Sequence, residues 1–309
     1  MPSNLIWRGV AYNGDALNPV FAAVGSGTSD AATTAGATSP DGITWSANTM
    51  TSRAYKGICY GNGLFVAVGT AATNAVTTSC STSPDGITWT SRTLPSASWQ
   101  AVAYNNNINA PMFVAVGSAA GATTTTAASS PDGITWTSRT TTARAYTAVC
   151  YGNGVFVAVG TGASGTASTT CAYSPDGDTW TSSTIPSLAY KSVAFGNGLF
   201  VAVGSPAADA ATTTYATSPD GVTWTSRTMP TSMAYKAVTF GNGLFVAVGT
   251  SASAGAITTI HTSADGIIWS PRVSTLSAAY RSVCYGNGIF VAVTAAAADA
   301  VTDDAVTSI

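Results

Sequence analysis

The sequence contains no glutamate and a single histidine, and it is poor in charge of either sign. Across 309 residues there are 11 Lys and Arg against 13 Asp, which gives a formal net charge of -2. A nucleic-acid surface needs clustered Lys and Arg, and an acidic tail needs runs of carboxylates. Neither pattern occurs, so we expect no nucleic-acid partner.

Long apolar runs are also missing. The first twenty residues, MPSNLIWRGVAYNGDALNPV, lack the basic region and apolar run of a secretory signal. No later segment approaches the roughly 18 apolar residues of a membrane span. The sequence therefore predicts a soluble chain that is not exported by the Sec route and does not insert into a membrane.

One stretch recurs along the whole chain, and its fullest form is SPDGVTWTSRTMPTSMAYKAVTFGNGLFVAVG at 218–249. Asp220-Gly221 lies between two β-rich runs and predicts a tight hairpin turn, because Gly tolerates positive φ. Gly241-Asn242-Gly243 predicts a second hairpin, followed by a strand apolar enough to be buried on both faces. The polar, Pro-containing segment at 228–232 is expected to connect the two hairpins.

The apolar strand opens with phenylalanine in seven copies, spaced by 43 to 48 residues. These are Phe21, Phe65, Phe113, Phe156, Phe200, Phe245 and Phe290. Four strands in about 45 residues, without helical periodicity, match one blade of a β-propeller. We therefore predict an all-β fold: a single domain over residues 1–309, a seven-bladed β-propeller of four-stranded antiparallel blades.

The Asp-Gly turn and the tryptophan that follows it occur only six times. The last copy ends at Thr307-Ser308-Ile309, where its turn should begin. The seventh blade is therefore expected to lack its outer strand unless residues 1 to 6, or a partner, complete it. An unpaired edge near Asp304 to Ile309 would accept a strand from a partner or a neighbouring subunit.

Five cysteines occupy two positions of the repeat. One position holds Cys59, Cys150 and Cys284, and the other holds Cys80 and Cys171. A third strand would separate the two positions by roughly 9 to 10 Å, which exceeds the reach of a disulfide. The number is also odd, so we expect small buried thiols.

The turn sequences SPDGITW at 39–45 and 83–89, and SPDGVTW at 218–224, resemble the Asp-box of sialidase-like (BNR) propellers. The likeness covers almost the whole chain, but the usual box, S-x-D-x-G-x-T-W, is one residue longer. The resemblance implies a structural turn between the third and fourth strands of a blade, on the face away from an active site. The structural-turn aspartates are then Asp41, Asp85, Asp132, Asp176, Asp220 and Asp265.

Sialidase chemistry, as the resemblance implies it, uses an arginine cluster, a tyrosine activated by a glutamate, and an aspartic acid. Glutamate is absent, and two-carboxylate hydrolysis would need aspartates closer together than the boxes, which lie on separate blades. Asp30, Asp209 and Asp299 share a repeat position with Asn74, Gly121 and Gly165, a pattern typical of left-handed turns. Asp303 and Asp304 are expected to be solvated end charges.

No phosphate loop or cluster of metal ligands occurs in the sequence, and His261 is expected to lie within a strand. The prediction is therefore no enzyme, no catalytic residues, no metal and no cofactor.

The candidate binding surface is the end of the ring that carries the variable connections. There the first strand of every copy opens with an aromatic residue: Trp7, Tyr55, Trp99, Tyr146, Tyr190, Tyr235 and Tyr280. The residues that follow are Arg8, Lys56, Gln100, Thr147, Lys191, Lys236 and Arg281. Aromatic rings beside donors can stack on sugars, which predicts a glycan-binding channel mouth. Packing between blades would also repeat in every copy, and strict repetition favours it.

The composition, rich in Thr, Ala, Ser and Gly and poor in charge, is similar to that of phage fibre, decoration and receptor-binding proteins. We therefore expect a non-enzymatic structural or binding propeller in a virion assembled in the host cytoplasm, with virion proteins, neighbouring subunits or a cell-surface glycan as partners. The alternative is a stand-alone lectin-like propeller, extracellular by a non-Sec route. A glycoside hydrolase is the third and weakest interpretation.

Overall fold

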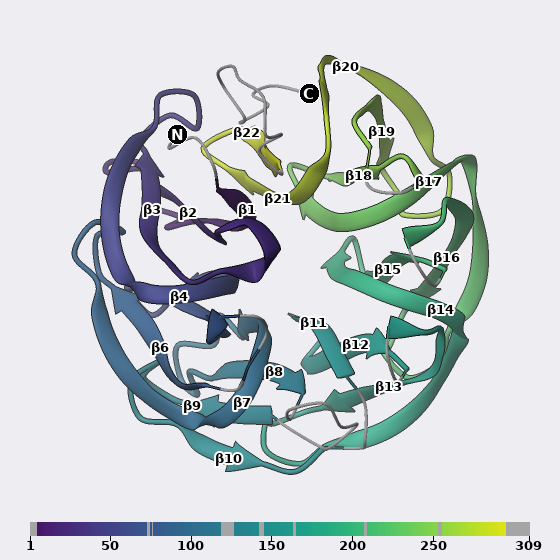
Figure 1. The fold of residues 1–309 in the computed structure, drawn as a ribbon. Coiled ribbons are helices and arrows are strands. Elements are labelled where there is room, and N and C mark those ends of the chain that lie inside the picture. Colours follow the sequence, from purple (N-terminus) through teal and green to yellow (C-terminus); the bar gives the residue numbers. More distant parts are fainter. Residues whose placement is uncertain are drawn as a thin grey trace.

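The computed structural model describes residues 5–72, 75, 77–118, 127–141, 145–162, 165–206, 209–252 and 255–294. These residues form mainly antiparallel strands, and the 3-10 turn η1 (Thr28–Asp30) follows β2. The prediction of an all-β fold is confirmed. Figure 1 shows the strands arranged in a ring around a central opening, with the N-terminal β1 beside the C-terminal β21 and β22.

The strands fall into layers counted outward from the opening. The inner strands border the opening, either over their whole length or over their second half. They are β1 (Ile6–Tyr12), β4 (Ser46–Gly61), β7 (Thr90–Tyr104), β11 (Ala145–Gly152), β14 (Thr181–Gly196), β17 (Thr225–Gly241) and β21 (Tyr280–Gly286). The second layer is β2 (Phe21–Ser26), β5 (Leu64–Thr70), β8 (Phe113–Ser118), β12 (Val155–Thr161), β15 (Leu199–Ser205), β18 (Leu244–Thr250) and β22 (Ile289–Thr294). The third layer is β3 (Thr33–Ser39), β6 (Thr77–Ser83), β9 (Ala127–Ser130), β13 (Ser168–Ser174), β16 (Thr212–Ser218) and β19 (Ile257–Ser263). The short outer strands are β10 (Thr137–Arg139) and β20 (Ser270–Ala278).

Four long strands, β4, β7, β14 and β17, each belong to two sheets. The first half of β17 pairs with β16 and its second half pairs with β18. Hydrogen bonding therefore runs continuously through two ten-stranded sheets, β1–β10 and β11–β20, and through the separate pair β21–β22. Sharing a strand links the outer edge of one group of strands to the inner edge of the next.

The expected connection at 228–232 is therefore not a loop, and this part of the prediction is corrected. It lies inside β17, where Thr214 pairs with Thr228 but Thr212 pairs with Met233. The residues between form a bulge, and Pro230 fits there because a bulge does not require its missing amide donor.

The turns agree with the sequence. The glycines of all six Asp-Gly turns have φ between 72° and 77°, as at Gly221 (φ 74°). In the second hairpin Asn242 (φ 47°) and Gly243 (φ 75°) are both left-handed. Positive φ is therefore supplied by the residue types that tolerate it best.

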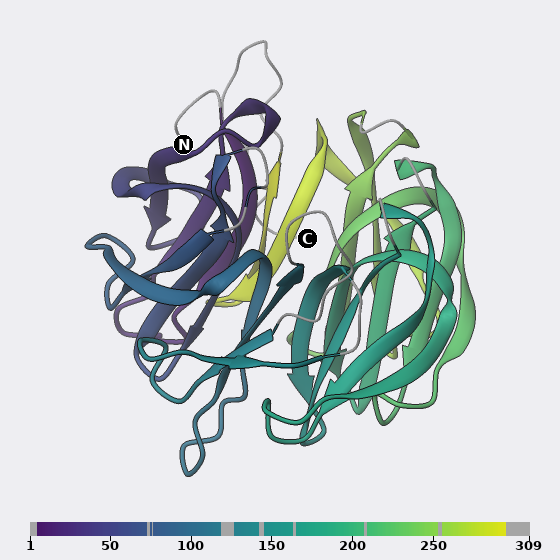
Figure 2. The ribbon, with the colours of Figure 1, turned by 60° about the horizontal axis from the view of Figure 1, so that its bottom comes forward.

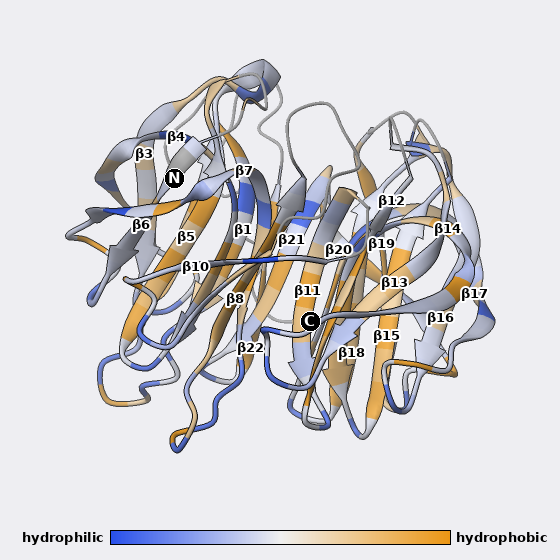
Figure 3. Ribbon diagram, turned by 90° about the horizontal axis from the view of Figure 1, so that it is seen from below, coloured by the Kyte–Doolittle hydropathy of each residue, from blue (hydrophilic) through white to orange (hydrophobic). Residues whose placement is uncertain are grey.

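The core lies between neighbouring groups of strands around the ring, where the second-layer strands are buried on both faces. Figure 3 shows this as hydrophobic colour along β5, β8 and β15, with hydrophilic colour at the turns. The two ends of the described chain meet in the same way: Leu5 and Trp7 pack with Val291 and Val293. Figure 2 shows β1 and β22 side by side from a second direction.

The predicted gap in the last blade falls on residues outside the described ones, as does the edge from Asp304 to Ile309. At the N-terminus, Ile6 is the first residue of β1 and pairs with Ser26. Ile6 therefore belongs to the first group of strands and does not complete the last.

Candidate functional site

A β-bulge interrupts every strand that borders the central opening. In β4, Tyr55 pairs with Gly69 and Gly57 pairs with Val68, so Lys56 has no partner across the ladder. The same one-residue shift follows the aromatic residue of each inner strand. The seven extra residues are Arg8, Lys56, Gln100, Thr147, Lys191, Lys236 and Arg281. We call this set the bulge ring.

The bulge ring lines a central cavity of about 250 Å³ together with the two residues that follow each bulge, or the one residue Ala237 after Lys236. A bulge redirects the side chain of its extra residue, which here brings residues of all seven inner strands to one cavity. Neighbouring inner strands pack closely: a Cβ at Gly57 would lie 3.0 Å from the Cα of Ala101. The charged side chains that line the cavity all belong to the bulge ring.

The aromatic residues of the predicted site do not face this cavity, and that part of the prediction is corrected. Trp7, Tyr55, Trp99, Tyr146, Tyr190, Tyr235 and Tyr280 are each 0% exposed. Tyr190 donates a hydrogen bond to the Pro186 carbonyl (2.7 Å), and Trp99 donates to the Pro95 carbonyl (3.0 Å), four residues earlier in each case. The rings thus pack between sheets and hold the long strands' bulges, and they offer no surface for stacking on a sugar.

Two aspartates tie the cations of the bulge ring together in pairs. Asp30 Oδ1 lies 2.6 Å from Arg8 Nη2 and 2.5 Å from Lys56 Nζ, on neighbouring inner strands. Asp209 Oδ1 lies 2.6 Å from Lys236 Nζ and 3.9 Å from Lys191 Nζ. Both aspartates have positive φ (58° and 55°), as the left-handed-turn prediction required, but their ion pairs were not predicted.

The charges of the ring influence one another. Burial tends to raise the pKa of Asp209, but the hydrogen bond and charge of Lys236, with the charge of Lys191, outweigh it and hold that pKa below its ordinary value. Burial, followed by the nearby charge of Arg8, lowers the pKa of both Lys56 and Arg281. The Nε of Arg281 is buried without a hydrogen-bond partner among the described residues.

One sector of the bulge ring is neutral. Gln100 donates to Ser98 Oγ (3.1 Å), and Thr147 donates from its hydroxyl to the Tyr190 carbonyl of the adjacent inner strand (2.7 Å). The five cations occupy the rest of the ring, on β14, β17, β21, β1 and β4. The cavity is therefore positive on one side only.

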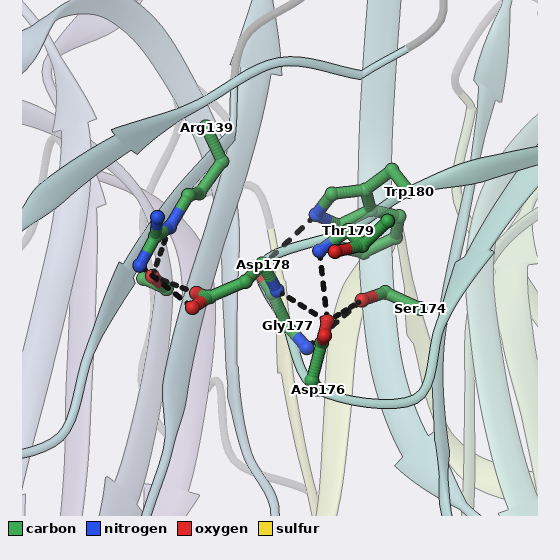
Figure 4. Close-up of polar contacts among 8 residues, drawn as sticks. Arg139, Ser174, Asp176, Gly177, Asp178, Thr179 and Trp180 are labelled. Carbon is green, nitrogen blue, oxygen red and sulfur yellow. Dashed lines mark hydrogen bonds and ion pairs between the residues drawn. The ribbon is translucent and has the colours of Figure 1, made fainter.

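The box aspartates lie in the turns between the third-layer strands and the strands that follow. Figure 4 shows Asp176, whose Oδ1 accepts hydrogen bonds from the Ser174 hydroxyl (3.0 Å) and from the amides of Asp178 and Thr179 (2.8 Å each). The Trp180 indole donates to the Gly177 carbonyl. The same contacts recur at Asp41, Asp85, Asp132, Asp220 and Asp265. One carboxylate oxygen of each box aspartate is thus used within its own turn.

The fourth box differs from the others at its exposed position, where Asp178 replaces Ile or Val. Asp178 forms an ion pair with Arg139 of β10 (2.7 Å), as Figure 4 shows. It also accepts a hydrogen bond from Ser129 (2.6 Å). This contact joins the two ten-stranded sheets where their hydrogen bonding is interrupted.

His261 lies in β19, as predicted, and is fully buried. Its Nε2 is 2.7 Å from Thr231 Oγ1, and burial lowers its pKa to about 4. The five cysteines are free thiols, as expected; Cys80 and Cys171 are buried and the other three are partly buried. Within the described ranges, no three His, Cys, Asp or Glu side chains are grouped to hold a metal, and no helix is long and apolar enough to cross a membrane.

The sequence contains a pattern that indicates the ion pairs of Asp30 and Asp209 with the bulge ring. Asp30 occurs in the copy whose own and next bulge residues are Arg8 and Lys56, and Asp209 occurs between Lys191 and Lys236. Where a bulge residue is neutral, at Gln100 and Thr147, the equivalent loop positions are Asn74, Gly121 and Gly165. The equivalent residue between Lys236 and Arg281 is Ala254, so charge varies together at the two positions in most copies of the internal repeat but not in that one.

The chain matches no protein-family model and no curated protein sequence. It is similar in structure to a protein described as YCF48 bound to D1 peptide, with a TM-score of 0.63 and 12% identity, covering 96% of this chain and 91% of that one. It is also similar to the computationally designed Ika8 protein, with a TM-score of 0.55 and 12% identity, covering 98% and 96%. These likenesses support a β-propeller fold.

Proposed function

We propose that the chain is a non-enzymatic β-propeller that acts by binding, as a structural or receptor-contacting component of a phage virion. The observation that carries the binding role is the distribution of charge. Only 11 Lys and Arg occur in the sequence, and five of them stand in one ring around one cavity. A fold stabilised by apolar packing does not require that concentration, whereas recognition of a partner at the channel mouth does.

The finer architecture belongs to the same proposal. We interpret the pairings as seven blades, six with four described strands or half-strands and a last one with β21 and β22. We interpret the box as a shortened relative of the Asp-box. The virion assignment draws on the charge-poor, Thr-rich and Ser-rich composition, and the neighbour bound to a peptide is a precedent for a protein partner on this fold.

The lectin-like alternative is weakened by the burial of the aromatic residues, because stacking on sugar rings requires an exposed aromatic face. Hydrolysis is disfavoured by the state of the mouth carboxylates, since a glycosidase needs one protonated carboxyl and Asp209 is held ionised by two lysines.

The virion assignment is tested by electron microscopy of particles from a culture that carries the gene, labelled with an antibody against the chain. We expect the label at a fixed place on the capsid or tail. Label found only in the particle-free fraction would contradict the assignment. A glycan array run with the purified chain separates the lectin-like alternative.

A further inference from the structure

We propose that the charged side of the bulge ring binds a compact oxyanion carrying two or more negative charges, of the size class of phosphate. The proposal rests on the binding role proposed above and names its ligand class. It does not depend on the virion assignment.

The first argument is the balance of charge. Five cations line the cavity, and the described carboxylates that pair with them are Asp30 and Asp209. Asp299 shares their repeat position and lies outside the described residues. Even with Asp299 counted, cations exceed carboxylates by five to three. An anion in the cavity would offset that excess.

The second argument is the cost of holding the cations where they are. Lys56 and Lys236 have side chains only 8% and 7% exposed, and burying a charge is unfavourable unless opposite charge compensates it. Arg281 stands in the middle of the charged sector, near the like charge of Arg8, with its Nε unsatisfied. A bound anion would supply both the missing acceptor and the opposite charge.

The third argument is size. Pockets for drug-sized ligands have volumes of roughly 300 to 1,000 Å³. The cavity of about 250 Å³ is smaller than that. It suits a small anion or the anionic end of a larger molecule. Multivalent charge is favoured because several cations on different strands can each contribute a charge-assisted hydrogen bond.

The test is calorimetric titration of the purified full-length chain with inorganic phosphate, O-phosphoserine and citrate, at constant ionic strength set with sodium chloride. We expect saturable binding of at least one of them, together with a rise in melting temperature that grows with its concentration. Binding of phosphate alone would identify the free ion as the ligand. Binding of both phosphate and O-phosphoserine would show that a phosphate ester is accepted, and binding of citrate alone would identify a carboxylate ligand. Absence of heat and of stabilisation with all three would overturn the proposal.

Two matched variants place the site. R281Q should weaken binding about tenfold or more, because a hydrogen bond to a charged group contributes roughly 1.5 to 3 kcal/mol. R272Q makes the same change of charge on the outer strand β20, where Arg272 contacts Thr262, and should leave the affinity unchanged. Equal affinities of R281Q and R272Q would overturn the proposed location. R281K retains the charge and should recover part of the affinity, which guards against a folding defect in R281Q.

A third variant acts in the opposite direction. D209N removes a carboxylate that competes for Lys191 and Lys236, so anion affinity should increase. If the lysines serve only to anchor Asp209, D209N will lower the melting temperature without any gain in affinity, and the proposal fails. Failure here leaves the microscopy test of the virion assignment unaffected, so the two can be separated.

Discussion

Aspartates have different roles at the two ends of the ring, the box end with the Asp-Gly turns and the mouth with the bulge ring. At the box end, Asp220 accepts hydrogen bonds from Ser218 and from the amides of Val222 and Thr223, all within one turn. At the mouth, Asp209 pairs with lysines from two inner strands. The box contacts recur in six copies, and the mouth contacts occur only where the neighbouring bulge residues are basic. Repetition therefore accompanies the aspartates that hold turns, and departure from repetition accompanies the end for which we propose a binding role.

The largest expected effect is at the aromatic residues beside the bulge ring. Tyr235→Ala removes a fully buried ring and its hydrogen bond to the Thr231 carbonyl, and should lower the free energy of unfolding by about 3 to 5 kcal/mol. Tyr235→Phe keeps the ring and should cost only about 1 kcal/mol. Urea denaturation measures both. If Tyr235→Ala left stability unchanged, the mouth aromatics would not be packing residues and the contrast between the two ends would break down.

The next effect is at the box end. Asp220→Ala removes the acceptor of the Val222 and Thr223 amides, and because both contacts are exposed and water can replace the carboxylate, it should cost about 0.5 to 1.5 kcal/mol. Because the turn lies at the far end of the ring from the cavity, phosphate affinity in the titration above should not change. A loss of anion binding in Asp220→Ala at a temperature where it is folded would show that the two ends are not independent.

A smaller effect is expected in the pH dependence of stability. Burial lowers the pKa of His261 to about 4 from its ordinary 6.5, so between these values the unfolded chain binds a proton that the folded chain does not. The contribution of His261 is complete above pH 6.5 and is lost as the pH falls toward 4. His261→Ser, which copies Ser81 and its contact with Tyr55, should reduce the slope of melting temperature against pH in that window. An unchanged slope would mean that His261 is already protonated in the folded state.

The smallest effect is expected in the alkylation of Cys80, which lies in β6 between the two ends of the ring. Burial raises the pKa of the Cys80 thiol to about 12, and its side chain is 0% exposed. Alkylation at pH 8 should therefore leave Cys80 unmodified in the folded chain and modify it in denaturant, as read by peptide mass spectrometry. Rapid modification of the folded chain would indicate local opening of β6.

Much of the fold followed from the sequence because turn chemistry and strand periodicity are local. Asp-Gly and Asn-Gly predicted left-handed residues that the structure contains, at Gly221 and Gly243 among others. The continuity of β17 through Pro230 was not predictable in this way, since it depends on which strand pairs with each half. The blade count and the last blade's missing strand stay predictions.

The site was predicted in part. The basic followers, such as Lys191 and Lys236, were identified as binding candidates, but their aromatic neighbours were placed with them. The missing element is the bulge, which turns the aromatic residue into the core and its follower into the cavity, and no residue type encodes it. The pairing of Asp209 with those lysines is also a contact distant in sequence, and only its variation across the repeats indicates it.

The ion pair between Arg139 and Asp178 has a mechanical consequence. Among the described residues no backbone ladder joins β10 to β11, so the two ten-stranded sheets contact each other there through side chains. A pull that separates the two sheets there would break side-chain contacts, whereas separation within a ten-stranded sheet must shear a row of backbone hydrogen bonds. Concentrated salt should weaken the ion pair by screening it. We therefore expect this seam to be one of the places where load is relieved before a strand ladder is lost.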